Sequence, residues 1–312
     1  ITFKNSPSTE YLSNITIDKN IQTIDFEVGE PQKYYSKELY EGQGGNGKTH
    51  KHLYDIGHRN LVYVAPSWLL ANDKKMEYKK NTGKELKVLA HASILAGSQS
   101  YKLSKIYGVY IFDEASMLSE ESKRFLLKNI FGKVIFCGDI GYQLPPYTGI
   151  EMNKKGFDNI VELTKNYRFK ENDKIIDIIK LVRNNINGGI DCSKLGFKHV
   201  DKEYVKNNYK KEDIILVTQN KFNDEYCEMF PHIEKYRIIA NSGEFNTGHI
   251  TFEKPNISKN NYSFRHGFTV HSVQGSTFTN NIYIDMRNFT STRHFYTAIS
   301  RAKSHNQIFL VF

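Results

Sequence analysis

Short apolar runs rich in β-branched residues constrain the fold of this chain most strongly. They occupy residues 61–65, 109–112, 134–137, 214–218, 282–284 and 308–312. Because the runs lack polar alternation, they are typical of strands buried on both faces of a parallel sheet. More helical stretches, such as residues 119–129 and 173–184, separate them. This alternation predicts an α/β fold.

The length and composition are those of a globular protein with about two domains. The chain has 312 residues, of which 39% are hydrophobic and 25% charged, and its formal net charge is +9. This charge favours a polyanionic partner, although a basic composition alone is a weak indication. No apolar run approaches the roughly 20 residues that span a bilayer, so we expect no membrane association.

The three cysteines, Cys137, Cys192 and Cys227, are widely spaced and form no CxxC pair. Neither a disulfide framework nor a zinc site is therefore expected, and an intracellular, reducing compartment fits best. The sequence begins at Ile1 and not at Met. We therefore expect it to be a piece of a longer protein.

A glycine-rich segment, GQGGNGKT at residues 42–49, matches the pattern G-x₄-G-K-[ST]. Such a loop turns its backbone N–H groups toward phosphates at the start of a helix. Lys48 would bind the β- and γ-phosphates, and the hydroxyl of Thr49 would hold Mg²⁺. Residues 36–41 before the loop are largely charged and predict a poor buried strand, so a glycine-rich turn without a nucleotide stays an alternative. The candidate nucleotide-binding residues are Gly42, Gly44, Gly45, Asn46, Gly47, Lys48 and Thr49.

Two carboxylates, Asp113 and Glu114, directly follow the apolar run at 109–112. In P-loop ATPases the first carboxylate supports Mg²⁺ and the second can activate the attacking water. An acidic pair that caps the next helix is the alternative. The glycine-rich loop and the acidic pair in this order together predict an ATP site with Mg²⁺ held by Thr49 and Asp113.

A third segment, VIFCGDIGYQLPP at residues 134–146, is a predicted strand followed by a proline-stabilised loop. The loop can direct Asp139 and Gln143 toward the γ-phosphate. Because an amide can hydrogen-bond both water and phosphate, Gln143 is a candidate sensor of hydrolysis.

Seven ordered blocks together resemble the superfamily 1 helicases. They are GQGGNGKT (42–49), VAPS (64–67), DEAS (113–116), GDIGYQLPP (138–146), LTKNYRF (163–169), FTVHSVQGSTF (268–278) and YTAISRAK (296–303). The resemblance implies two tandem RecA-like P-loop domains with parallel sheets, ATP in the cleft between them, and single-stranded nucleic acid across both. We expect residues 36–160 to form the first domain and 161–312 the second, and we assign no role to residues 1–35.

The resemblance also implies roles for residues outside the phosphate loop. Arg168 and Arg301 would reach the γ-phosphate from the second domain, and Gln274 and Gly275 would link the ATP cleft to the nucleic acid. Arg183 and Arg237 are expected to be solvated surface charges. The implied nucleic-acid-binding residues are Pro66, Ser67, Trp68, His91, Asn220, His271 and Ser272. A buried structural role for His91 and a packing role for Trp68 remain alternatives.

The sequence departs from this family in two respects. The adenine-binding glutamine motif is not evident in residues 1–40. The segments between His91 and Asp113 and between Gly243 and Thr269 leave almost no room for the inserted pin and SH3-like subdomain that usually split duplexes. A translocating core is therefore better supported than strand separation.

The leading hypothesis is an ATP-dependent 5′-to-3′ DNA helicase of the RecD/Dda-like branch, part of a longer replication protein. An RNA helicase like those of positive-strand RNA viruses, in the host cytoplasm or nucleus, shares the same motor and is the close alternative. From another class, a binding module that uses the nucleotide only as a switch is disfavoured, because the catalytic set is intact. A small-molecule kinase would not need a second α/β unit with its own arginines.

Overall fold

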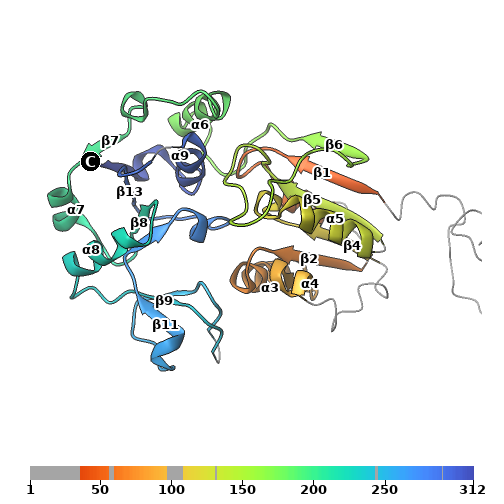
Figure 1. Ribbon diagram of the computed structural model, residues 1–312, viewed down its shortest axis with the longest axis horizontal. Helices are drawn as coiled ribbons and strands as arrows, with labels where there is room; N and C mark the ends of the chain where they lie inside the picture. Colours follow the sequence, from red (N-terminus) through yellow and green to blue (C-terminus); the bar gives the residue numbers. More distant parts are fainter. Residues whose placement is uncertain (1–35, 56–59, 97–107, 131, 243–244, 290) are drawn as a thin grey trace, which may run out of the picture.

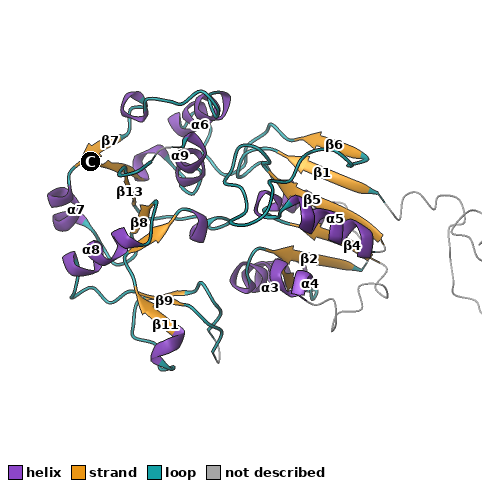
Figure 2. Cartoon of the chain, in the orientation of Figure 1, coloured by secondary structure: helices purple, strands orange, loops and turns teal. Residues whose placement is uncertain are grey.

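The computed structural model describes residues 36–55, 60–96, 108–130, 132–242, 245–289 and 291–312. The N-terminal segment 1–35 therefore lies outside the described residues. Two parallel sheets lie next to each other, each with helices on both faces (Figures 1 and 2). We call residues 36–162 the first lobe, 163–173 the connecting segment and 174–312 the second lobe.

The sheet of the first lobe is entirely parallel, in the order β3-β2-β4-β5-β1-β6. Its strands are β1 (Lys37–Glu41), β2 (Leu61–Ala65), β3 (Lys87–Ala90), β4 (Gly108–Phe112), β5 (Gly132–Gly138) and β6 (Asn159–Glu162). The predicted domain boundary at residue 160 falls within β6, which pairs with β1. The division into domains stays a prediction.

The expectation that residues 36–41 make a poor buried strand is wrong. β1 lies between β5 and β6, and Leu39, Tyr40 and Glu41 are buried. Its charges are compensated by ion pairs, because Glu38 meets Lys133 at 2.7 Å and Glu41 meets Lys154 at 2.6 Å. A strand with paired charges can thus occupy a position that apolar runs usually fill.

Two groups of helices cover the two faces of the first sheet. The helices are α2 (Lys48–His50), the π-helix η2 (Lys51–Asp55), α3 (Trp68–Thr82), α4 (His91–Ala96), the 3₁₀-helix η4 (Ala115–Met117) and α5 (Glu120–Asn129). Residues of α4 and α5 pack on one face, and residues of η2 and α3 on the other. Alternate residues of β2, β4 and β5 enter different clusters, which confirms that these predicted strands are apolar on both faces.

The second lobe repeats this layered arrangement around the parallel order β12-β8-β13-β14-β7. The strands are β7 (Lys198–Val200), β8 (Ile214–Val217), β12 (Gly267–Thr269), β13 (Ile282–Asp285) and β14 (Ile308–Val311). Residues of α6 (Lys174–Asn184) and α9 (Thr292–Ile299) pack on one face, and those of α7 (Lys202–Asn208) and α8 (Lys221–Met229) on the other. Short 3₁₀-helices are η5 (Cys192–Lys194), η6 (Lys259–Asn261), η7 (His271–Val273) and η8 (His305–Gln307).

A small antiparallel sheet projects from the second lobe (Figure 1). It contains β9 (Tyr236–Ile238), β10 (Ile250–Thr251) and β11 (Tyr262–Phe264), in the order β10-β9-β11. The expectation of almost no room for an insertion here is therefore too strict, because two of these strands lie between Gly243 and Thr269. None of the helices among the described residues is long and apolar enough to cross a membrane.

Candidate nucleotide site

The phosphate loop connects the end of β1 to α2. Gly45 and Gly47 have φ values of 89° and 72°, in the left-handed region that favours glycine. The Lys48 ammonium donates to the carbonyl oxygens of Gly42 and Gln43, the second at 3.0 Å. Asn166 of the connecting segment donates to the Gly44 carbonyl at 3.0 Å. The loop is thus shaped by its glycines and held from outside by an amide.

The acidic pair lies beside this loop at the end of β4. The Thr49 hydroxyl donates to one oxygen of Asp113 at 2.8 Å, and the Tyr63 hydroxyl donates to the other at 2.7 Å. Hard oxygen ligands of this kind suit Mg²⁺, which keeps several waters and takes few protein ligands. Thr49 and Asp113 therefore fit the metal site that the sequence predicts. Glu114 has a φ of 48°, a strained value for a residue other than glycine.

These groups surround a cavity of about 310 Å³. Its lining includes residues 44–49 of the phosphate loop and its helix, both carboxylates, and Gln143 from the loop after β5. Arg168 from the connecting segment and Gly275 from the second lobe also contribute to the wall. A Cβ atom on Gly275 would approach Leu70 to 2.6 Å, so its glycine lets the second lobe come close to α3.

The two predicted arginines lie at the cavity and directly behind it. Arg168 lines the cavity, and its guanidinium donates to the Ser300 carbonyl. Burial, together with the charge of Arg301, lowers the pKa of Arg168 to about 10. Arg301 is fully buried and donates to the Thr297 carbonyl and the Ser300 hydroxyl, at 3.1 and 2.9 Å. Two guanidinium groups whose charges repel each other next to a phosphate loop indicate a site for an anion.

A buried amide network joins the lobes next to Glu114. The Gln274 amide donates to the Ser116 hydroxyl at 3.1 Å, across the interface between the lobes. The Gln143 amide is satisfied when its nitrogen faces Ser116 and Glu114, at 2.9 and 3.0 Å, and its oxygen then accepts from Arg301 at 3.3 Å. Gln143 is therefore in contact with both a carboxylate of the first lobe and an arginine of the second.

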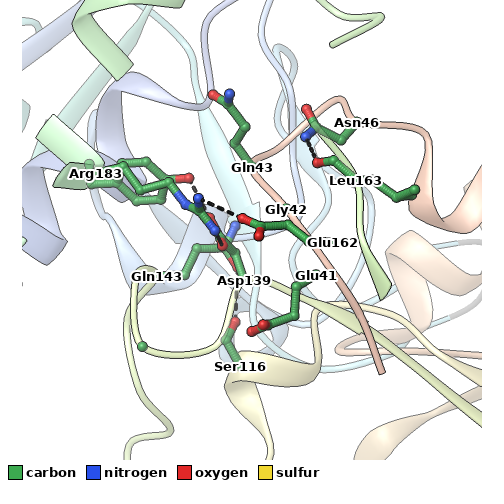
Figure 3. A network of polar contacts seen from close by, with 12 residues as sticks. Glu41, Gly42, Gln43, Asn46, Ser116, Asp139, Gln143, Glu162, Leu163 and Arg183 are labelled. Carbon is green, nitrogen blue, oxygen red and sulfur yellow. Dashed lines mark hydrogen bonds and ion pairs between the residues drawn. The ribbon is translucent and has the colours of Figure 1, made fainter. Parts of the chain in front are cut away.

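Asp139 and Arg183 differ from what the sequence suggests. Asp139 does not line the cavity; it is fully buried and accepts from Arg183 at 3.0 Å and from the Tyr296 hydroxyl. Figure 3 shows Arg183 directed at Asp139 and Glu162. Arg183 is therefore not a solvated charge. Arg237 is partly buried as well and donates to the Ser272 carbonyl at 3.2 Å.

No family model matches this sequence, and neither does any curated protein. Solved structures do match over nearly the whole chain. Pif1 helicases at forked double-stranded DNA align at 16% identity over 90% of this chain and 89% of theirs, with a TM-score of 0.61. A Pif1 helicase from Bacteroides in complex with ADP-AlF3 and single-stranded DNA aligns at 18% identity over 89% of each chain, with a TM-score of 0.55.

The chain shares its fold with these Pif1 structures. An arterivirus helicase, nonstructural protein 10 in complex with DNA, also matches it, at 16% identity over 88% of this chain and 60% of that one, with a TM-score of 0.50. The expected α/β fold with two tandem parallel-sheet domains is thereby confirmed.

The predicted nucleic-acid residues of the first lobe have mainly structural contacts. Ser67 caps α3 by accepting from the Leu70 amide at 3.4 Å, and Pro66 lines the cavity. Trp68 packs against both cores of the first lobe. His91 is buried, and burial lowers its pKa to about 4. These contacts favour the structural alternatives for Trp68 and His91, and nucleic-acid binding by the four residues stays a prediction.

The predicted nucleic-acid residues of the second lobe are more accessible. Asn220 is exposed next to α8 and accepts from Arg265 at 2.9 Å. His271 and Ser272 belong to η7, and both are partly exposed. The His271 ring lies 4.3 Å from the ring of Tyr147, which belongs to the first lobe. Nucleic-acid binding by these three residues stays a prediction.

Sequence reasoning missed several residues that build the site. Tyr63, Asn166 and Ser116 carry no nucleotide chemistry of their own, but they hold Asp113, the phosphate loop and Gln143. Asn166 and Ser116 lie inside the LTKNYRF and DEAS blocks, so their position was a usable signal. Tyr63 lies in an apolar run, where only the structure shows its hydroxyl at Asp113.

Proposed function

We propose that this chain hydrolyses ATP to move along single-stranded nucleic acid. Its motif set favours a 5′-to-3′ DNA helicase. The observation that carries the proposal is the cavity that combines Lys48, both carboxylates, Gln143 and Arg168 from different parts of the chain. The helicase fold, found in Pif1 structures with DNA, supports the same function.

The arrangement suits transfer of the γ-phosphoryl group of ATP to water. The Glu114 carboxylate would accept the proton of a water whose oxygen bonds to the γ-phosphorus, while the bond to the bridging oxygen of ADP breaks. Lys48 and Arg168 would neutralise the charge on the phosphoryl oxygens. Mg²⁺, when bound at Thr49 and Asp113, supplies further neutralisation. Arg301 would act through Gln143, with which it is in contact.

Single-stranded nucleic acid would cross both lobes. We assign contacts to Asn220, His271 and Ser272 in the second lobe and to the segment 66–68 in the first, with His91 as a weaker candidate. Small polar groups and backbone N–H groups at these positions suit phosphate contacts without sequence readout. The net charge of +9 supports an electrostatic contribution.

DNA is favoured over RNA, because the QLPP and LTKNYR blocks resemble the RecD/Dda-like branch. The match to an arterivirus helicase keeps a viral RNA helicase as the second candidate. ATP hydrolysis measured with poly-thymidine DNA and with poly-uridine RNA separates the two. We also propose that the chain belongs to a longer replication protein. Its free cysteines support a reducing compartment.

Substitutions of two residues that line the nucleotide cavity test the enzymatic proposal. Lys48→Ala and Glu114→Gln should each abolish hydrolysis stimulated by nucleic acid, a loss of about 10²-fold or more. Glu114→Gln should still bind a fluorescent ATP analogue, because it keeps the shape of the cavity and removes only the proton acceptor.

Lys128→Ala and Glu121→Gln, at exposed positions of α5, are matched controls that should hydrolyse ATP like the unchanged protein. Full turnover in both site variants would disprove the motor and leave the nucleotide-switched binding module as the better account.

A further inference from the structure

The turn that carries Gln143 is held by the second lobe at two points. We call residues 139–143 the Gln143 turn. Its first residue, Asp139, accepts from Arg183 of α6 and from Tyr296 of α9. In its middle, the Gly141 amide donates at 3.1 Å to Glu151, and Glu151 accepts from Arg293 of α9 at 2.8 and 2.9 Å.

Arg183 makes more contacts than an arginine in a surface ion pair usually does. Its guanidinium lies 3.8 Å from the centre of the Tyr142 ring, which is part of the same turn. It also meets Glu162 at the end of β6, at 3.2 Å. With 18% of its side chain exposed and its partner Asp139 fully buried, the pair is shielded from solvent. Separating such a pair is strongly unfavourable, because it leaves a buried charge uncompensated.

A short series of hydrogen bonds connects the Gln143 turn to the nucleotide site. The amides of Tyr142 and Gln143 both donate to the Asp139 carbonyl at 3.1 Å. The Gln143 side chain then reaches Ser116 and Glu114 next to the cavity. A shift of Asp139 or Gly141 would therefore move the amide that contacts the proposed proton acceptor.

We propose that Arg183 and Arg293 are positioning residues, which set the Gln143 turn, and through it Glu114, according to where the second lobe lies. Neither arginine lines the cavity. Their effect is on alignment: nucleic acid that changes the position of the second lobe changes the rate of hydrolysis through this turn. The inference rests on the proposed ATP hydrolysis and adds the route by which nucleic acid controls it.

Arginine variants test this route without removing the buried carboxylate, whose loss could prevent folding. Arg293→Gln and Arg183→Lys should each lower the stimulation of kcat by poly-thymidine DNA about tenfold, because misalignment by a fraction of an ångström is costly at a reacting centre. Binding of a fluorescent ATP analogue should stay within about twofold, since neither side chain touches the nucleotide cavity. Arg124→Gln, which removes an exposed guanidinium that pairs with Glu120, should change neither quantity.

A double-variant comparison separates positioning from general structural support. Combined with Gln143→Ala, Arg293→Gln should cause no additional loss, because both act through the same side chain. Independent, multiplying losses, or unchanged stimulation in the folded single variants, would overturn the inference. If the unchanged protein hydrolyses no ATP with either DNA or RNA, the proposed function itself fails, which is a different outcome.

Discussion

Two glycines with left-handed backbone, Gly45 and Gly83, differ in what surrounds them. A Cβ atom on Gly45 would lie 2.3 Å from the Cβ of Arg168, whereas one on Gly83 would meet nothing within 4 Å. Both substitutions to alanine incur left-handed strain of about 1 kcal/mol. Only Gly45→Ala must also displace Arg168 from the phosphate loop.

We therefore predict that Gly45→Ala weakens binding of a fluorescent ATP analogue by about tenfold or more, a cost of about 1.4 kcal/mol. Gly83→Ala should bind the analogue normally and lose only about 1 kcal/mol of stability. Equal affinity in the two variants would show that the close approach of Arg168 to the loop does not shape the site.

At the residue scale, patterns with fixed spacing could be predicted and contacts between distant segments could not. Lys48, Thr49 and Asp113 can be predicted as candidates because phosphate and metal chemistry demands those residue types in that order, and all three line one cavity. The partner of Asp139 could not be found, since Arg183 lies in another lobe and an isolated arginine is usually a surface charge. Because the partners of such a pair are far apart in the sequence, no local sequence pattern predicts the pair.

At the scale of elements, the junction of the small sheet with the second lobe depends on a buried lysine. Lys235, directly before β9, donates to the Tyr209 hydroxyl at 2.9 Å and to the Asp213 carbonyl. Burial lowers its pKa from 10.5 to about 7. Between about pH 7 and pH 10 the unfolded chain therefore binds more protons than the folded chain, and this residue makes stability rise with pH.

Lys235→Met should remove that contribution. The free energy of unfolding, measured by urea denaturation at pH 7 and pH 9, should rise less with pH in the variant, by up to about 1.4 kcal/mol per pH unit. Lys194→Met, at a position where 82% of the side chain is exposed, is the control that should keep the pH dependence of the unchanged protein. Identical slopes in all three proteins would mean that Lys235 stays protonated in the fold.

The central strands could be predicted from sequence because each is apolar on both faces. The strands that escaped are short or carry charge. β7, β9 and β10 have three, three and two residues, too few for a periodic pattern. The charged pattern of β1 is misleading because its glutamates are neutralised by lysines on β5 and in the loop before β6. Such compensation depends on tertiary contacts.

At the scale of the whole molecule, the proposed function requires that ATP hydrolysis and lobe movement occur together. The cavity draws its wall from both lobes and the connecting segment, and Gln274, Arg183 and Arg293 join the lobes around it. The sequence predicted two lobes and a shared site from ordered blocks. It could not predict which contacts join them, because those contacts form only when the sheets are packed side by side.

A translocation assay tests this central claim most directly. The protein would be mixed with ATP and single strands of DNA or RNA of increasing length, each labelled with a fluorophore at the 5′ or the 3′ end. We predict that on DNA the fluorescence change at the 3′ end is delayed in proportion to strand length, and that Lys48→Ala shows no delayed signal. Signals independent of strand length at both ends, on DNA and on RNA, would contradict the account.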